Sequence, residues 1–292
     1  MRKLIDFVRR FIRMYTEHKL TISAAAMSYN LTMTFFPLLI VLYTLLGNSY
    51  TAALSLLDFV DNLMSAETVT IIRDFIYYVA THRSTAMFVA GLTVLLTSSS
   101  AAVRVIASTI NSMQGSARFT GIWALIYSVV FSVVLLLGVY LSFFIILAGP
   151  GILEKINEIL PIIDLSGVWI HIRLFVLYGI LLLLFWSIYI GMRPRKDHYR
   201  TWPGALLAAL AMSALSYIFS NVISASVRYP LVYGYLASMI LLMLWLYFCS
   251  LIVFAGAAFN IILRNFSREK QTKEASSRSE PPAPAGPPDS RA

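Results

Sequence analysis

The stretch YLASMILLMLWLYFCSLIVFAGAAFNIIL, residues 235–263, decides the class of fold. It belongs to a run of 35 residues without a charge, between Arg228 and Arg264. An α-helix needs about 20 apolar residues, each rising about 1.5 Å, to cross the roughly 30 Å hydrocarbon core of a bilayer. The sequence therefore predicts a transmembrane helix at 235–263.

Five more uncharged runs precede this one. Each is long enough for one membrane span but not for two spans and a turn, and none alternates polar and apolar residues as a barrel strand does. They contain 38 residues after Lys19, 20 after Arg83, 35 after Arg118, 19 after Arg173 and 27 after Arg200. We predict an all-α, polytopic membrane protein with six transmembrane helices, at about 25–47, 86–107, 121–148, 172–191, 203–224 and 235–263.

The composition agrees with a membrane protein. Apolar residues make up 59% of the 292 residues and charged residues 13%, about half the charged fraction of a soluble domain. The single cysteine, Cys249, cannot build a disulfide framework, and the four histidines lack metal-ligand spacing. We therefore predict no catalytic, cofactor-binding or metal-binding residues, and no nucleic-acid partner.

The basic residues predict the orientation. Of the 23 Lys and Arg residues, 18 fall on one side of the predicted membrane, mainly in the first 25 residues, the loop between the fourth and fifth spans, and the C-terminal tail. Loops rich in Lys and Arg stay in the cytoplasm. Both termini are therefore predicted to be cytoplasmic.

Three regions follow along the chain. Residues 1–20 are predicted to form an amphipathic cytoplasmic helix, either in the headgroup plane or packed on the ends of the spans. Residues 21–265 form the six-span domain, and the polar, Pro-rich residues 266–292 are predicted to be a disordered cytoplasmic tail. In the first external loop, about 48–85, apolar stripes at 54–64 and 71–79 predict two amphipathic helices, the second starting at Ser65-Ala66-Glu67. These helices either cap the bundle or act as a lipid-facing lid.

Polar residues inside the spans are the candidates for function. They are neutral apart from Arg104, and the spans contain no acidic residue, which disfavours a carboxylate-driven pump. Two interpretations stay open: tight helix packing, or a polar cavity that contacts a lipid headgroup. Arg104 either snorkels to phosphate headgroups or binds an anionic headgroup. The candidates are Asn30, Pro37, Ser99, Arg104, Asn111, Tyr217, Asn221 and Asn260.

Several short stretches carry a family resemblance. They are AAAMSY at 24–29, FFPLL at 35–39, residues 98–111 around Arg104, WPGA at 202–205, YG at 233–234, WLY at 245–247 and GAAFN at 256–260. In this order they resemble the YihY/BrkB family of bacterial inner-membrane proteins, over about residues 15–263. The resemblance implies six spans in the inner membrane. One departure is Ala258, where family members often carry Glu.

Two functions are compatible with this sequence. The first is handling or transport of a lipid or amphiphilic envelope component, with membrane lipids, including anionic ones, as partners. The alternative is a structural or regulatory membrane protein that transports nothing. The family has also been labelled ribonuclease BN-like, but RNA hydrolysis needs clustered carboxylates with a metal, or an acid–base pair beside an RNA groove. The short cytoplasmic loops contain neither, and the sequence predicts no oligomeric state.

Overall fold

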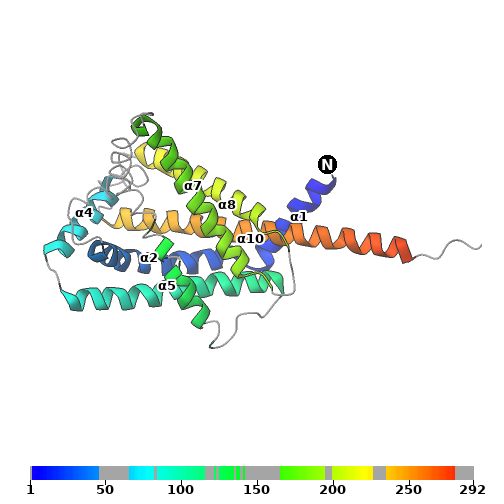
Figure 1. The fold of residues 1–292 in the computed structure, drawn as a ribbon, viewed down its shortest axis with the longest axis horizontal. Helices are drawn as coiled ribbons and strands as arrows, with labels where there is room; N and C mark the ends of the chain where they lie inside the picture. The colour runs from blue at the N-terminus through cyan, green and yellow to red at the C-terminus, as the bar shows by residue number, and fades with distance from the viewer. Residues whose placement is uncertain are drawn as a thin grey trace, which may run out of the picture.

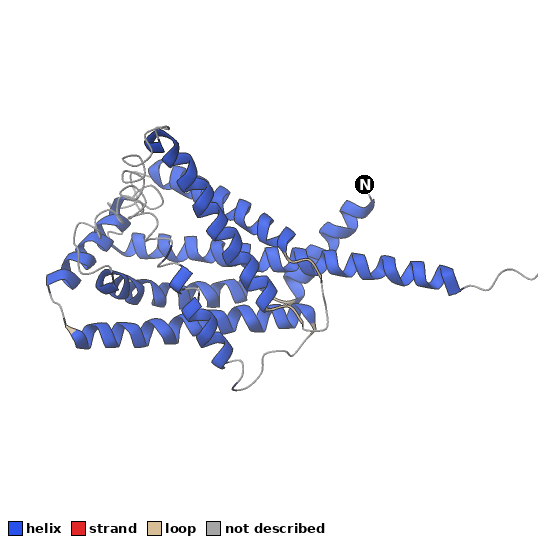
Figure 2. Ribbon diagram, in the orientation of Figure 1, coloured by secondary structure: helices blue, strands red, loops and turns tan. Residues whose placement is uncertain are grey.

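The computed structural model of the chain describes residues 2–45, 66–81, 84–115, 122, 125–134, 136–138, 141, 165–194, 199–225 and 235–279. All regular secondary structure within these ranges is helical (Figure 2). Five long helices form a bundle: α2 (Leu20–Leu45), α5 (Thr85–Gln114), α7 (Leu165–Gly191), α8 (Trp202–Ala225) and α10 (Tyr235–Ser279). Helices α1 (Arg2–Glu17) and α4 (Ala66–Thr81) lie at its two ends (Figure 1).

The helices are those of a membrane protein. Four segments are long and apolar enough to cross a bilayer: Leu20–Val41, Thr85–Gln114, Trp202–Phe219 and Met239–Thr272. Two shorter apolar helices, Leu125–Gly138 and Phe175–Gly191, lie at the positions of the third and fourth predicted spans. The predicted class, an all-α membrane protein, is confirmed. The complete six-span topology stays a prediction.

Helix α10 is the central helix, because it contacts α1, α2, α4, α5 and α8. The buried core lies toward one end of the bundle, where α2 begins, α5 and α7 end, and α8 begins. We call this the basic end, because Lys19, Arg193 and Arg264 lie there. Small core residues allow the helices to approach closely; they are Ala24, Ala205, Ala208, Ala209, Ala257 and Ala258.

Away from the basic end, the bundle opens. Figure 1 shows α7 and α8 running together and diverging from α10 toward the opposite end. On α8 this leaves Leu210, Tyr217 and Ile218 exposed. In a membrane such apolar and aromatic side chains face lipid, so the divergence enlarges the surface that lipid can reach.

Helix α4 covers the end of the bundle opposite the basic end. It contacts α2 and α10, with Ile72 buried and the Phe75 ring 5.3 Å from that of Phe36. The predicted helix start at Ala66 is confirmed. The apolar stripe predicted at 54–64 lies outside the described residues.

The C-terminal tail requires a correction. Disorder was predicted from residue 266, whereas α10 continues without interruption to Ser279. Residues 264–279 are rich in Arg, Lys, Glu and Gln, which favour helix, and Glu269 forms an ion pair with Arg10 of α1. The low hydropathy of this segment therefore marks the end of the apolar span and not the end of the helix. Residues 280–292 lie outside the described part of the chain.

Candidate functional site

Four polar side chains form an exposed stripe along one face of α5. They are Thr93, Thr97, Arg104 and Ser108, and all four are exposed. Spacings of four, seven and four residues place them within about 60° of one another around a helix of 3.6 residues per turn. At about 1.5 Å per residue, the stripe covers roughly 22 Å of the helix. We call it the α5 stripe.

Arg104 points away from the basic end. Its Nη1 donates a hydrogen bond of 2.6 Å to Oγ of Ser100, one helical turn earlier. Because α5 ends at the basic end, this bond directs the guanidinium toward the middle of the helix, as the backward tilt of helical side chains favours. Arg104 lies ten residues before Gln114, about 15 Å from the end of α5. This conformation is the opposite of snorkelling toward the basic end.

A cluster of buried serines holds Ser100 in place. Ser99 and Ser100 of α5 face Ser128 and Ser132 of the apolar helix Leu125–Gly138, and all four are buried. The Ser100 and Ser128 hydroxyls are 3.4 Å apart, and Ser132 donates to Ser99. Hydroxyl contacts between membrane helices contribute about 1 kcal/mol or less each, so the cluster acts chiefly by orienting Ser100 toward Arg104.

A second polar feature joins α8 to α10. The side chain of Asn260, 1% exposed, accepts a hydrogen bond of 2.8 Å from the Gly204 N–H and donates one of 2.9 Å to the Thr201 carbonyl. The first N–H groups of a helix lack partners within the helix. Asn260 of α10 therefore caps the N-terminus of α8 from a neighbouring helix. We call this contact the Asn260 joint.

Glycines make the joint possible. A Cβ at Gly204 would overlap the Gly256 carbonyl oxygen and the Asn260 side chain. A Cβ at Gly256 would overlap the Tyr189 hydroxyl, which donates a 2.9 Å hydrogen bond to the Val253 carbonyl. Glycine at both positions lets the backbones of α8 and α10 touch, and Tyr189 adds α7 to the same contact.

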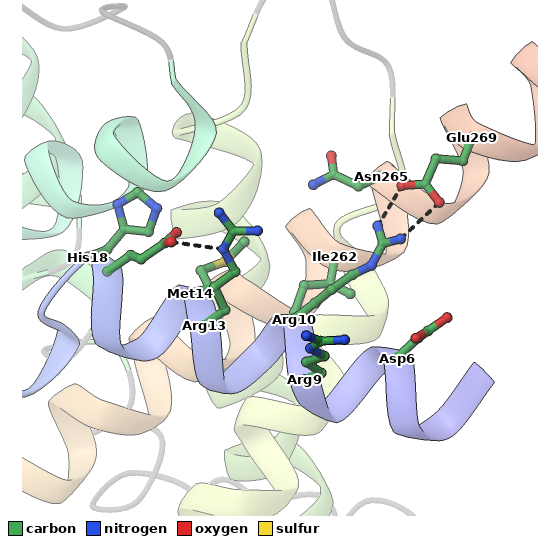
Figure 3. A pocket seen from close by; sticks show the side chains of 10 residues that line it. Asp6, Arg9, Arg10, Arg13, Met14, His18, Ile262, Asn265 and Glu269 are labelled. Carbon is green, nitrogen blue, oxygen red and sulfur yellow. Dashed lines mark hydrogen bonds and ion pairs between the residues drawn. The ribbon is translucent and has the colours of Figure 1, made fainter. Parts of the chain in front are cut away.

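A charged hollow of about 800 Å³ lies between α1 and α10 at the basic end (Figure 3). Arg10 forms two hydrogen bonds with the carboxylate of Glu269, of 2.6 and 3.0 Å, and its guanidinium lies 4.4 Å from the centre of the Phe266 ring. The bond to Glu269 raises the pKa of Arg10 above its usual value. Arg13 bonds Glu17 at 2.8 Å, which likewise raises the pKa of Arg13. The Arg10–Glu269 pair attaches α1 to the continuation of α10, whereas Arg13–Glu17 lies within α1, and the two pairs neutralise much of the charge in the hollow.

Among the residues that the structure describes, no group of three or more His, Cys, Asp or Glu side chains lies close enough to hold a metal ion. The polar features that remain are the α5 stripe, the serine cluster, the Asn260 joint and the α1–α10 hollow.

The comparisons with known proteins decide the family. The sequence profile of the family described as Virulence factor BrkB matches residues 11–281. The chain belongs to this family. It is also 22% identical over 264 residues to the ribonuclease-like protein YfkH of Bacillus subtilis (strain 168), covering 89% of this chain and 95% of that protein. No solved structure matches the chain.

The family assignment confirms the resemblance, and the structure gives its residues a physical role. Two of the stretches that carry it, WPGA at 202–205 and GAAFN at 256–260, meet at the Asn260 joint of this BrkB-family chain. Ala258 is completely buried beside the joint. The small side chain fits the close contact between α8 and α10.

The eight predicted site residues of the BrkB-family chain fall into different environments. Three are exposed: Arg104, Tyr217 and Asn221, while Asn30 is half-buried. Three are buried: Ser99 in the serine cluster, Asn111 on α5, and Asn260 in the joint. Pro37 is half-buried within α2, which continues through it to Leu45.

Two of the asparagines are bonded within their own helices. The Asn30 amide donates to the Ala26 carbonyl and the Asn221 amide to the Tyr217 carbonyl, both at 2.8 Å. None of the eight predicted residues lines the α1–α10 hollow. A single polar cavity built from them stays a prediction. Thr93, Thr97 and Ser108 were not among the predicted site residues, although their helical spacing from Arg104 could have indicated them.

Proposed function

We propose that this BrkB-family protein handles an anionic amphiphile of the bacterial envelope and moves its headgroup along the α5 stripe across the inner membrane, with both termini cytoplasmic. The observation that carries the proposal is Arg104, an exposed cation whose bond to Ser100 directs it toward the middle of a membrane helix. The apolar tails of such a molecule would stay in the lipid beside α5.

The position of the guanidinium determines which partner fits Arg104. An Arg at the centre of a membrane helix costs about 2.5–3.5 kcal/mol on an insertion scale, and Arg104, three residues before the end of the predicted span at 86–107, bears part of that cost. One neutral hydroxyl from Ser100 offsets only part of that cost, whereas a phosphate or carboxylate accepts two parallel N–H bonds from Arg. An anionic headgroup at this depth is therefore the partner whose chemistry fits Arg104 best.

The hydroxyls of the α5 stripe extend the same surface to both sides of Arg104. Thr93 donates to the Val89 carbonyl at 2.8 Å, Thr97 to the Thr93 carbonyl at 2.9 Å and Ser108 to the Val105 carbonyl at 3.0 Å. Each hydroxyl can exchange this bond for one to a passing headgroup by rotating about χ1. The stripe thus offers a series of weak polar contacts around one strong cation.

The alternative, a structural or regulatory membrane protein, rests on the same bonds. The Thr and Ser hydroxyls are satisfied within α5, and the serine cluster and the Asn260 joint hold helices together. In that case Arg104 anchors α5 at a fixed depth, and no lipid moves.

Lipid redistribution separates the two functions. The full chain is reconstituted into vesicles, and the leaflet exchange of tail-labelled phosphatidylglycerol and phosphatidylcholine is followed by chemical quenching of the outer label. We expect faster exchange of phosphatidylglycerol than in protein-free vesicles. Arg104→Gln should slow it about tenfold or more, because a hydrogen bond to a charged group contributes about 1.5–3 kcal/mol.

The matched control is Arg268→Gln, which removes an exposed cation from the continuation of α10 and should leave the rate unchanged. Equal exchange in wild-type and protein-free vesicles would contradict transport. Wild-type exchange that survives Arg104→Gln would contradict the role of Arg104.

A further inference from the structure

Helix α1 uses only half of its apolar face to pack against the bundle. The Phe7 ring lies 5.3 Å from the Phe259 ring of α10, and Phe11, Met14 and Tyr15 pack against the core. These four residues lie on one side of a helix whose apolar residues extend further around its circumference.

The other half of the apolar face is uncovered. Ile5, Val8 and Ile12 are 63%, 48% and 57% exposed, and together with Arg9 they line a hollow of about 470 Å³. Their spacing of three and four residues makes one continuous stripe. We call it the α1 stripe.

The connection to α2 places the α1 stripe beside the lipid-facing surface of the bundle. Only His18 and Lys19 separate the two helices, and Lys19 adopts a left-handed conformation with φ 48° that turns the chain sharply. Ile22, in the first turn of α2, is 65% exposed. Figure 1 shows α1 lying obliquely to α10 at the basic end, where it does not prolong α2. Helix α1 therefore lies at the depth of the lipid headgroups, where α2 enters the membrane.

The charges beside the α1 stripe favour an anionic surface. Arg10 and Arg13 bond Glu269 and Glu17, as the dashed lines of Figure 3 mark. Arg9 lines both the α1–α10 hollow and the α1 stripe, and no side chain in the described ranges forms an ion pair with it. Arg2 and Lys3 add two cations at the start of the helix. The cation adjoining the apolar stripe is thus available for a ligand.

We infer that α1 is an in-plane docking surface for anionic phospholipid. Ile5, Val8 and Ile12 insert among the acyl chains of the leaflet at the basic end, and Arg9 binds a phosphate headgroup there. This site is separate from the α5 stripe and does not depend on transport. An aliphatic stripe flanked by cations, at the level of the headgroups, matches the chemistry of that leaflet.

Depth-dependent quenching tests the inference on the full chain. A fluorophore is attached at Val8→Cys in a Cys249→Ala background, and the protein is reconstituted into vesicles of phosphatidylcholine with phosphatidylglycerol. We expect quenching by a lipid-borne nitroxide and protection from aqueous iodide. The same label at Arg13→Cys, on the charged face, should be quenched by iodide.

The role of Arg9 is measured by comparing how strongly phosphatidylglycerol and phosphatidylcholine, each carrying the nitroxide, quench the fluorophore at position 8. Arg9→Gln should lower the preference for phosphatidylglycerol about fivefold, because one basic residue near an anionic surface contributes about 1 kcal/mol. Arg13→Gln, one turn later, is the matched control and should keep the preference. Because neither readout follows lipid movement, their outcome is independent of the proposed transport.

Three results would contradict the inference in whole or in part. Iodide quenching at Val8 equal to that at Arg13 would mean that water covers the α1 stripe. Self-quenching between Val8 labels, without quenching by the lipid nitroxide, would mean that a second copy of the chain covers it. An unchanged preference in Arg9→Gln would remove Arg9 from the site.

Discussion

At the scale of single residues, Lys19 is a point of conformational strain. Its φ of 48° lies in the left-handed region, which costs a non-glycine residue about 1–3 kcal/mol, yet its carbonyl accepts the N–H groups of Ile22 and Ser23 at the start of α2. Lys19→Gly should therefore stabilise the protein by about 1 kcal/mol, because glycine adopts this conformation without a Cβ clash. Thermal unfolding in detergent measures the change, with Lys19→Arg as a neutral control. A lower unfolding temperature for Lys19→Gly would contradict the strain.

At the scale of elements, the Asn260 joint determines how α8 meets α10. Asn260→Ala would leave the buried Gly204 N–H without its partner, at a cost of about 1–3 kcal/mol. It would also remove one of the two hydrogen bonds that the Thr201 carbonyl accepts, the other coming from the Ala205 N–H at 3.4 Å. The unfolding temperature in detergent should therefore fall clearly. Asn221→Ala is the matched control, because that exposed amide bonds only its own helix. Equal effects of the two substitutions would argue against the joint.

The helices also show which parts of the fold and of the candidate site could be predicted from the sequence alone. Apolar length is a local property, so the spans at 25–47, 86–107, 203–224 and 235–263 correspond to α2, α5, α8 and α10. The helical continuation of α10 was missed because hydropathy reports burial in lipid and not helix formation. The α5 stripe was readable from residue spacing. The direction of Arg104 was not readable, because it depends on a partner that the serine cluster holds in place.

At the scale of the whole molecule, these features divide the bundle into two regions. The core, the Asn260 joint and α1 tie the helices together at the basic end, while α7 and α8 diverge from α10 toward the other end (Figure 1). A bundle closed at one end and open at the other is compatible with the proposed handling of an amphiphile within the bilayer. The α5 stripe extends along an exposed face of the bundle, with its one cation ten residues from the end of α5.

We propose that an anionic headgroup reaches Arg104 within the membrane. The most direct test is crosslinking with a phosphatidylglycerol analogue that carries a photoreactive group on its headgroup, followed by mapping of the modified peptides by mass spectrometry. We predict crosslinks on α5 between Thr97 and Ser108 in the wild-type protein, and their loss in Arg104→Gln while crosslinks at the basic end remain. Headgroup crosslinks confined to the basic end in the wild-type protein would contradict the claim.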